Sequence, residues 1–187
     1  MSGGVLVAGI GNLFLSDDGF GSEVARRLLA GPLPPGVRVV DYGIRGMHLA
    51  YDLLDGYDGL LVVDAMPGDG SPGDLTVLEV GPDDLGHGEL DAHGMAPAAV
   101  LASLGQLGGD LPPTLVLGCH PADVGEGMGL TPAVEAAVEA AVALVHELLA
   151  GQPARARPGQ PAGWALSEEL VGRTRVAAAG QQREGGP

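Results

Sequence analysis

Residues 5–21 read VLVAGIGNLFLSDDGFG, and this stretch decides the fold. The continuous apolar run over 5–8 predicts a strand that is covered on both faces. Gly9 and Gly11 then allow the backbone to turn sharply. A helix is expected to begin near Asp18, so the turn brings Asp17 and Asp18 to the carboxyl end of a central strand. In open α/β sheets, functional sites form at that edge.

The two glycines suggest a dinucleotide-binding turn, which the neighbouring residues do not favour. That motif needs a third glycine to bring helix and strand close together. Phe14 stands at the third position, and Asp41 lies too far downstream to be the acid that binds the ribose. The pair of glycines alone is a weak signal.

Strands and helices alternate through the first 151 residues, which predicts a single-domain α/β fold. We expect three α/β/α layers around a twisted, mostly parallel sheet of about five strands. The stretch 74–80 has no helix before it, so it is expected to be an antiparallel edge strand. The other expected strands are 36–40, 60–63 and 115–117, and the expected helices are 18–30, 47–54, 96–107 and a last helix that Thr131 and Pro132 open and Gly151 ends.

The last 36 residues differ from the rest in composition. Residues 152–187 are rich in Pro, Gly, Arg, Ala and Gln and show no apolar periodicity. Such a segment cannot bury enough apolar surface to offset the entropy lost on ordering. We therefore expect a domain over 1–151 and a largely disordered tail over 152–187, in which 164–170 could form a helical turn.

The charge is strongly negative and unevenly placed. Residues 1–151 hold four arginines against 21 of the 24 acidic residues, a net charge of −17. This surface should repel nucleic acid and anionic lipid. No apolar run is long enough for a membrane span and no signal peptide precedes the first strand, so we expect a cytoplasmic protein without membrane insertion.

The residue types also exclude several kinds of catalysis. The chain has no lysine, which removes the phosphate-binding lysine of a P-loop and Schiff-base chemistry. Cys119 is its only cysteine, so an internal disulfide and a cysteine zinc cluster are excluded. Cys119 and His120 are neighbours at a strand end and should point to opposite sides. Pairing of Cys119 with His93 stays open, but a small buried hydrophobe is the favoured role.

Three candidate site residues follow predicted strands or precede a predicted helix: Asp18, Asp64 and His93. If the first and third strands are neighbours, the two carboxylates lie within about 10 Å of each other. Two carboxylates and one imidazole suit a divalent cation such as Ni, Zn, Mn or Fe(II). Simpler roles are also open: Asp17 and Asp18 could serve the helix dipole, Asp64 an Asx-turn, and His93 could be solvated. For Asp17 the helix-dipole role is preferred.

Several ordered motifs resemble the [NiFe]-hydrogenase maturation endopeptidases. The glycine turn through Gly21 looks like the family's G-x-G-N-x-L-x-x-D-[DE]-x-x-G signature, and Asp64-Ala65 after an apolar strand looks like its second motif. His93 falls where the family places its histidine, and Gly129-Leu130-Thr131-Pro132 with Glu135 resembles its closing segment. The resemblance spans about residues 4–150. It departs at 41–46, where Arg45 replaces a small or polar residue and leaves substrate contact there open.

The resemblance implies a function. The family trims the C-terminus of the hydrogenase large subunit, and its nickel-contacting residues correspond to Asp18, Asp64 and His93. These residues would act as metal ligands and catalytic residues toward nickel that arrives already inserted in the large-subunit precursor. The protein is then expected to be a nickel-dependent, aspartic-type endopeptidase that acts as a monomer. The alternative is a nickel- or subunit-binding maturation chaperone with this fold and no proteolysis.

Overall fold

The computed structural model describes residues 3–81, 97–151, 163–166 and 175–178, and within them one sheet lies between two layers of helices. The strand order is β2-β1-β3-β5-β4-β6. β1, β2, β3 and β5 are parallel, whereas β4 runs antiparallel to β5 and β6 pairs in parallel with β4. The strands are β1 (Val5–Ile10), β2 (Val37–Gly43), β3 (Gly59–Ala65), β4 (Leu75–Val80), β5 (Thr114–Cys119) and β6 (Arg175–Ala178).

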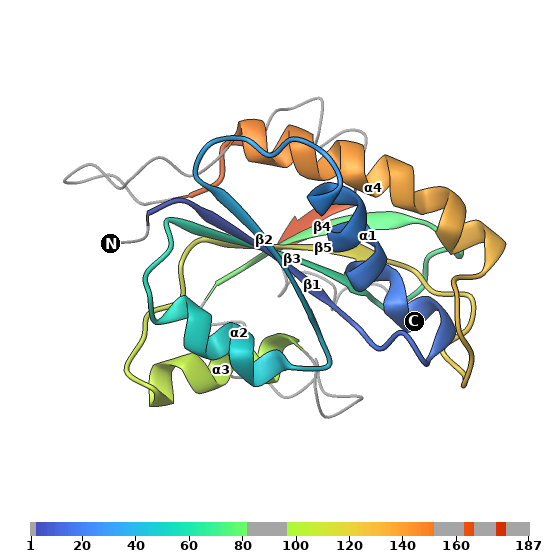
Figure 1. The fold of residues 1–187 in the computed structure, drawn as a ribbon, viewed down its shortest axis with the longest axis horizontal. Coiled ribbons are helices and arrows are strands. Elements are labelled where there is room, and N and C mark those ends of the chain that lie inside the picture. Colours follow the sequence, from blue (N-terminus) through green and yellow to red (C-terminus); the bar gives the residue numbers. More distant parts are fainter. Residues whose placement is uncertain (1–2, 82–96, 152–162, 167–174, 179–187) are drawn as a thin grey trace, which may run out of the picture.

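The helices cover both faces of this sheet (Figure 1). They are η1 (Ser16–Gly19), a short 3-10 turn, followed by α1 (Phe20–Leu29), α2 (Gly46–Leu53), α3 (Pro97–Gln106) and α4 (Pro132–Ala150). α1 and α4 lie on one face, and α2 and α3 lie on the other. The expected α/β/α layering is confirmed.

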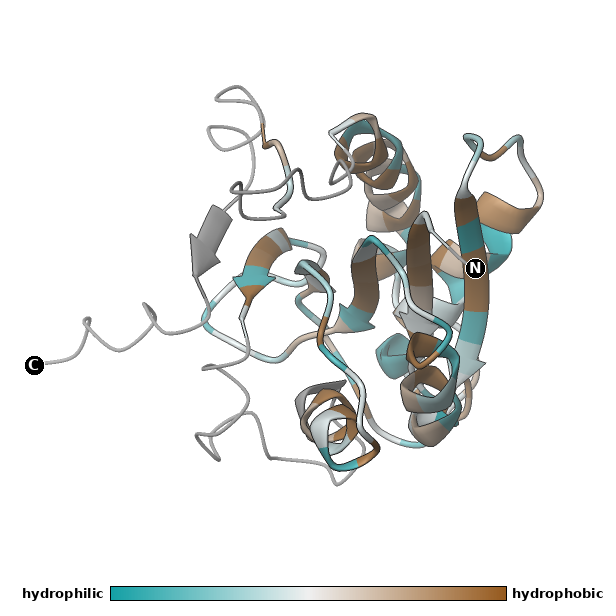
Figure 2. Ribbon diagram, turned by 90° about the vertical axis from the view of Figure 1, so that its left-hand side faces the viewer, coloured by the Kyte–Doolittle hydropathy of each residue, from teal (hydrophilic) through white to brown (hydrophobic). Residues whose placement is uncertain are grey.

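Alternate residues of the central strands supply two separate cores. In β1, Val5 and Val7 pack with α1 and α4, whereas Leu6 and Ala8 pack with α2 and α3. Successive strand residues point to opposite faces, so a strand that is apolar throughout can serve both cores. Figure 2 shows the result as brown strands between helices whose brown sides turn inward.

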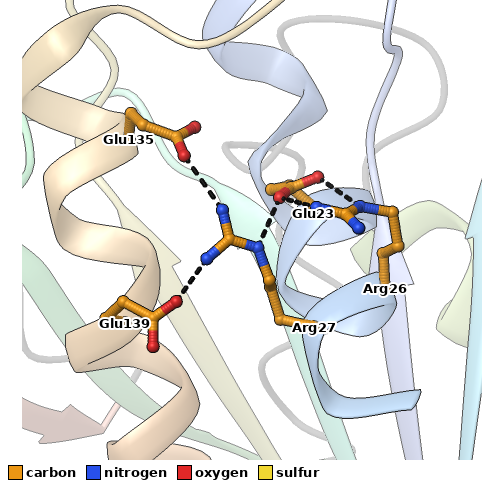
Figure 3. Close-up of polar contacts among 5 residues, drawn as sticks. All are labelled: Glu23, Arg26, Arg27, Glu135 and Glu139. Atoms are coloured by element: carbon orange, nitrogen blue, oxygen red, sulfur yellow. Dashed lines mark hydrogen bonds and ion pairs between the residues drawn. The ribbon is translucent and has the colours of Figure 1, made fainter. Parts of the chain in front are cut away.

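One guanidinium links the two helices of the first layer. Arg27 of α1 lies between three carboxylates, Glu23 of its own helix and Glu135 and Glu139 of α4 (Figure 3). The Nε–Glu23 distance is 2.8 Å and the Nη2–Glu135 distance is 3.0 Å. Surface ion pairs contribute little each, so this cluster adds little to the free energy of unfolding.

Two details differ from the sequence-based expectations. Asp18 lies in the 3-10 turn η1, and the helix proper begins two residues later at Phe20. The antiparallel strand 75–80 is not at the edge, because β6 pairs with its outer side. Within residues 152–187, 175–178 form β6 of the sheet and 163–166 pack on the domain, and the expectation of a largely disordered tail stays a prediction.

Trp164 is the residue that anchors the second of these segments. Its side chain is buried in the core beneath α4, and its Nε1 donates a hydrogen bond of 3.0 Å to the Pro113 carbonyl oxygen. The backbone of Ala165 donates to the Gly151 carbonyl oxygen. The single tryptophan of the chain is therefore part of the domain. Of residues 152–187, the structure describes 163–166 and 175–178.

Candidate active site

The turn after β1 holds Asp18 at the carboxyl edge of the sheet. The backbone nitrogen of Asn12 donates a hydrogen bond of 2.7 Å to Asp18 Oδ2. Gly11 has a φ of +140°, and a Cβ there would lie 1.8 Å from the Asp18 carbonyl oxygen. Only glycine fits at this position, because the turn packs directly against the residue that carries the carboxylate.

Gly21 allows the helix after Asp18 to approach the sheet closely. A Cβ at this position would lie 2.1 Å from the Val63 carbonyl oxygen and 2.2 Å from that of Ile10. The start of α1 therefore rests on the ends of β1 and β3. This is the packing role that the third glycine has in a dinucleotide-binding turn, here taken by a glycine seven residues further on than Phe14.

Asp64 reaches the same edge at the end of β3. β1 and β3 pair in parallel with Gly9 opposite Val63, as expected, so the two carboxylates follow neighbouring strands. Asp64 Oδ1 accepts a hydrogen bond of 2.8 Å from the Ala65 nitrogen. The residue as a whole is half-buried.

Burial and a like charge both act on Asp64. Burial raises the pKa of its carboxyl group well above the usual range, and the negative charge of Asp18 raises it further. The hydrogen bond from Ala65 opposes this shift without cancelling it. Two carboxylates that crowd each other in this way favour a bound cation, which would offset both their repulsion and the cost of burial.

The third predicted site residue, His93, lies outside the described residues. Within the described parts of the chain, no three His, Cys, Asp or Glu side chains are grouped closely enough to hold a metal ion. The structure thus brings Asp18 and Asp64 together, and the place of His93 beside them stays a prediction. The donor types of the three residues, two carboxylates and an imidazole, fit a divalent ion such as nickel.

Asp17 has a different role from the expected one at a helix start. Its side chain is fully buried, and its carboxylate accepts four hydrogen bonds from the loop 121–131. Oδ2 accepts from the nitrogens of Ala122 at 2.8 Å and Asp123 at 3.0 Å, and from Thr131 Oγ1 at 2.9 Å. Oδ1 accepts from the Thr131 nitrogen at 2.6 Å. Asp17 therefore anchors the loop that leads into α4.

These hydrogen bonds keep Asp17 ionised and involve the N-cap residue of α4. Burial alone would raise the pKa of its carboxyl group, but the hydrogen bonds from Thr131, Asp123 and Ala122 outweigh burial and lower the pKa. Thr131 is the N-cap residue of α4, as expected, with Pro132 in the first turn, yet its hydroxyl bonds to Asp17 instead of to its own helix. Nothing in the sequence pattern pairs residues 114 positions apart.

The structure argues against Cys119 as a nucleophile. The thiol is buried, and burial followed by the charge of Asp17 raises its pKa to about 12. A thiol with such a pKa stays protonated at neutral pH. Its neighbour His120 packs beneath the loop after β3, where Cβ atoms at Gly68 and Gly70 would collide with the imidazole ring. Cys119 is the buried hydrophobe that the sequence favoured.

Arg45 folds back onto the turn that carries it. Its Nε donates to the Tyr42 carbonyl oxygen at 3.2 Å, and its Nη2 donates to the Asp41 carbonyl oxygen at 3.0 Å. Asp41 Oδ1 accepts hydrogen bonds from Ser22 Oγ at 2.7 Å and the Gly43 nitrogen at 3.0 Å. The departure from the family pattern thus places a well-held cation after β2, at the same edge as Asp18.

Residues 22–148 match a family of known proteins, the hydrogenase maturation proteases. The chain belongs to this family. It is therefore a peptidase, which agrees with a site built at the carboxyl edge of the sheet. The matched residues include Asp64 and His93, and they begin just after Asp18.

Individual relatives agree with this assignment. The hydrogenase 2 maturation protease of Escherichia coli is 34% identical over 143 residues, which are 74% of this chain and 85% of that protein. The solved structure of the hydrogenase maturating endopeptidase HybD from E. coli has a TM-score of 0.66 and 30% identity, and the comparison covers 79% of this chain and 91% of that one. The hydrogenase 2 maturation peptidase of a Thaumarchaeota archaeon gives a TM-score of 0.62 and 33% identity over 79% of this chain and 98% of its own.

The helices of this protease do not include a membrane anchor in the parts described. None of them in residues 3–81 and 97–151 has both the length and the apolar composition that crossing a bilayer requires.

Proposed function

We propose that this peptidase removes a C-terminal peptide from the nickel-loaded large-subunit precursor of a [NiFe] hydrogenase. Asp18, Asp64 and His93 contact the nickel that the precursor carries. The observation that supports this most is the crowded pair of Asp18 and Asp64, in which the charge of one raises the pKa of the other. Such a pair is poised for a cation, and the resemblance to the maturation endopeptidases suggests the nickel of a hydrogenase precursor as that cation.

Each residue has a separate part in this function. Asp18 is held in place by the hydrogen bond from the Asn12 nitrogen to its Oδ2. Asp64 loses its proton when the cation approaches, because the positive charge offsets burial and repulsion. His93 completes the donor set. A nickel ion held there supplies polarisation of the neighbouring peptide carbonyl or of a water molecule.

The nickel belongs to the substrate because the protein offers few ligands of its own. Two carboxylates and one imidazole, without a thiolate, need not hold nickel tightly in the free protein. A precursor without nickel then offers nothing for these side chains to grip. Cleavage would therefore report that metal insertion is complete.

The test is the mass of the precursor after incubation with this protein. We expect loss of a C-terminal peptide from the nickel-loaded precursor and none from the folded precursor without nickel. Efficient cleavage of the nickel-free precursor would contradict the proposal. Binding without any change in mass would favour the chaperone alternative.

A pair of variants shows whether the site is responsible. Asp18→Asn should abolish cleavage, because the amide removes the charge that faces the cation. Asp110→Asn removes one negative charge from the exposed loop before β5, at the other edge of the sheet, and should cleave like the wild type. Equal activity of both variants would show that Asp18 is not a ligand.

A further inference from the structure

Large apolar side chains are exposed around the candidate site. Of the ten exposed large hydrophobic residues in the described parts of the chain, six lie on loops or helix starts at the carboxyl edge of the sheet. The other four, Leu29, Tyr51, Leu54 and Leu107, lie near the C-terminal ends of α1, α2 and α3. We name the six the carboxyl-edge apolar surface: Leu13, Phe14, Ile44, Met47, Val124 and Met128.

The most exposed members belong to two loops that are bonded together. Phe14 is 66% exposed and Met128 is 79% exposed. The Gly127 nitrogen donates to the Phe14 carbonyl oxygen at 2.9 Å, and the Ser16 nitrogen donates to the Gly127 carbonyl oxygen at 2.9 Å. Figure 1 shows these loops, the blue one after β1 and the gold one before α4, together at the right of the molecule. Phe14 and Met128 thus lie on either side of the two hydrogen bonds that join these loops.

The third loop adjoins the first on its other side. The Gly11 nitrogen donates to the Gly43 carbonyl oxygen at 3.1 Å, next to Ile44. Ile44 is followed by Met47 in the first turn of α2. The apolar residues therefore lie on three neighbouring loops, with the turn that holds Asp18 in the middle. Isolated exposed apolar residues are ordinary, whereas a group of them on adjoining loops marks an interaction site.

This surface is held in place before any partner binds. The buried carboxylate of Asp17 fixes both ends of the loop 121–131 through Ala122, Asp123 and Thr131. Ser16 Oγ adds a hydrogen bond of 3.2 Å to the Gly125 carbonyl oxygen. A partner that docks on preorganised loops loses little free energy to ordering them.

The charge of the molecule narrows the possible occupants. A second copy of this chain would bring a formal charge of −15 against the same charge, and an anionic membrane would be repelled likewise. Asp123 and Glu126 are exposed beside Val124 and Met128. The occupant that fits is a protein with an apolar patch and a basic rim, which brings its cleavable segment to Asp18.

We infer that the carboxyl-edge apolar surface is the docking site for the folded hydrogenase large-subunit precursor. This inference rests on the proposed function, and it assigns substrate recognition to side chains that take no part in the chemistry. Phe14 and Met128 are the contacts expected to contribute most, because large side chains near the centre of an interface carry most of its binding energy.

The test compares two sets of variants, and in both sets serine replaces a large exposed apolar side chain. Phe14→Ser and Met128→Ser should each weaken binding of purified nickel-loaded precursor at least about tenfold. In cleavage assays they should raise KM and leave kcat unchanged, because the catalytic side chains are intact. Leu29→Ser and Leu107→Ser are the controls. Leu29 is 53% exposed, close to the 51% of Leu13, but it lies at the end of α1 away from the site.

The outcomes separate this inference from the proposed function. If the wild type cleaves the precursor but both sets of variants bind it equally well, the docking site is wrong and the function stands. If the wild type binds without cleaving, the function fails, and the comparison of the two sets still tests the surface. A wild-type dimer in sedimentation that Phe14→Ser alone disrupts would overturn the inference in favour of a second copy. Circular dichroism checks that each variant is folded.

Discussion

Asp17 and Asp64 are two carboxylates near the same edge of the sheet, and their surroundings shift their pKa values in opposite directions. Asp17 accepts four hydrogen bonds, and they lower its pKa despite its burial. Asp64 accepts one from its own neighbour, and burial together with the charge of Asp18 raises its pKa. A carboxylate whose charge is fully satisfied serves the fold, and one whose charge is left unsatisfied is available for a ligand.

The largest effect expected from this comparison is on cleavage. Asp64→Asn should lower kcat/KM for the nickel-loaded precursor by more than about a hundredfold, because an amide cannot offset the charge of a cation. The measurement is the rate at which the C-terminal peptide appears. A rate within a fewfold of the wild type would place Asp64 outside the site.

Asp17→Asn should act on stability instead. The amide of asparagine has one oxygen in place of two, so at least one buried donor of the loop 121–131 loses its acceptor. The NH₂ group of the amide would then face other hydrogen-bond donors. We expect a loss of about 3 kcal/mol in the free energy of unfolding, measured by urea denaturation at pH 7. At temperatures where the variant is folded, most of the cleavage activity should persist.

Trp164→Ala is the matched control for that variant. It removes the packing of the indole and its hydrogen bond to Pro113 at the other edge of the sheet, at a cost of about 3–5 kcal/mol. If Asp17→Asn loses far more activity than Trp164→Ala at equal stability, Asp17 also positions the catalytic residues. In that case Asp17 would serve both the fold and the function.

The same two carboxylates should give opposite dependences of stability on pH. The folded pKa of Asp17 is lowered, so its contribution is complete above the unfolded pKa of about 3.9 and is lost as the pH falls toward the folded value. The folded pKa of Asp64 is raised, so its ionisation costs stability as the pH rises from about 4 through the folded value. Urea midpoints between pH 3 and 8 should show the gap between wild type and Asp17→Asn closing in acid. The gap to Asp64→Asn should open toward neutral pH.

The smallest expected effect is a gain in stability. Asp64→Asn should raise the free energy of unfolding at pH 7–8 by on the order of 1 kcal/mol, because it removes a buried charge that repels Asp18. The amide oxygen can still accept from Ala65. A stability loss in this variant, measured by the melting temperature without metal, would mean that the charge of Asp64 is satisfied within the protein.

The sequence predicted the layers because those depend on local patterns. The apolar runs over 5–8, 60–63 and 115–117 are typical of strands with two covered faces, and the parallel pairing of the first two brings Asp18 and Asp64 to one edge. The role predicted for Asp17 was wrong. In the sequence, an aspartate that interacts with the helix dipole, a contribution of about 0.3–1 kcal/mol, cannot be distinguished from one that anchors a distant loop. Trp164 and β6 were missed because neither has periodicity.

The pairing of β6 with β4 has a consequence for how the protein behaves when it is shortened. β6 bonds along Thr76–Glu79, the outer side of the last strand of the domain. A chain cut after Gly151 would leave the amide and carbonyl groups of that side facing water, where a second molecule can pair with them. The shortened protein should then associate as its concentration rises. The C-terminal residues would thus keep the protease from aggregating through its sheet edge, a task separate from its chemistry.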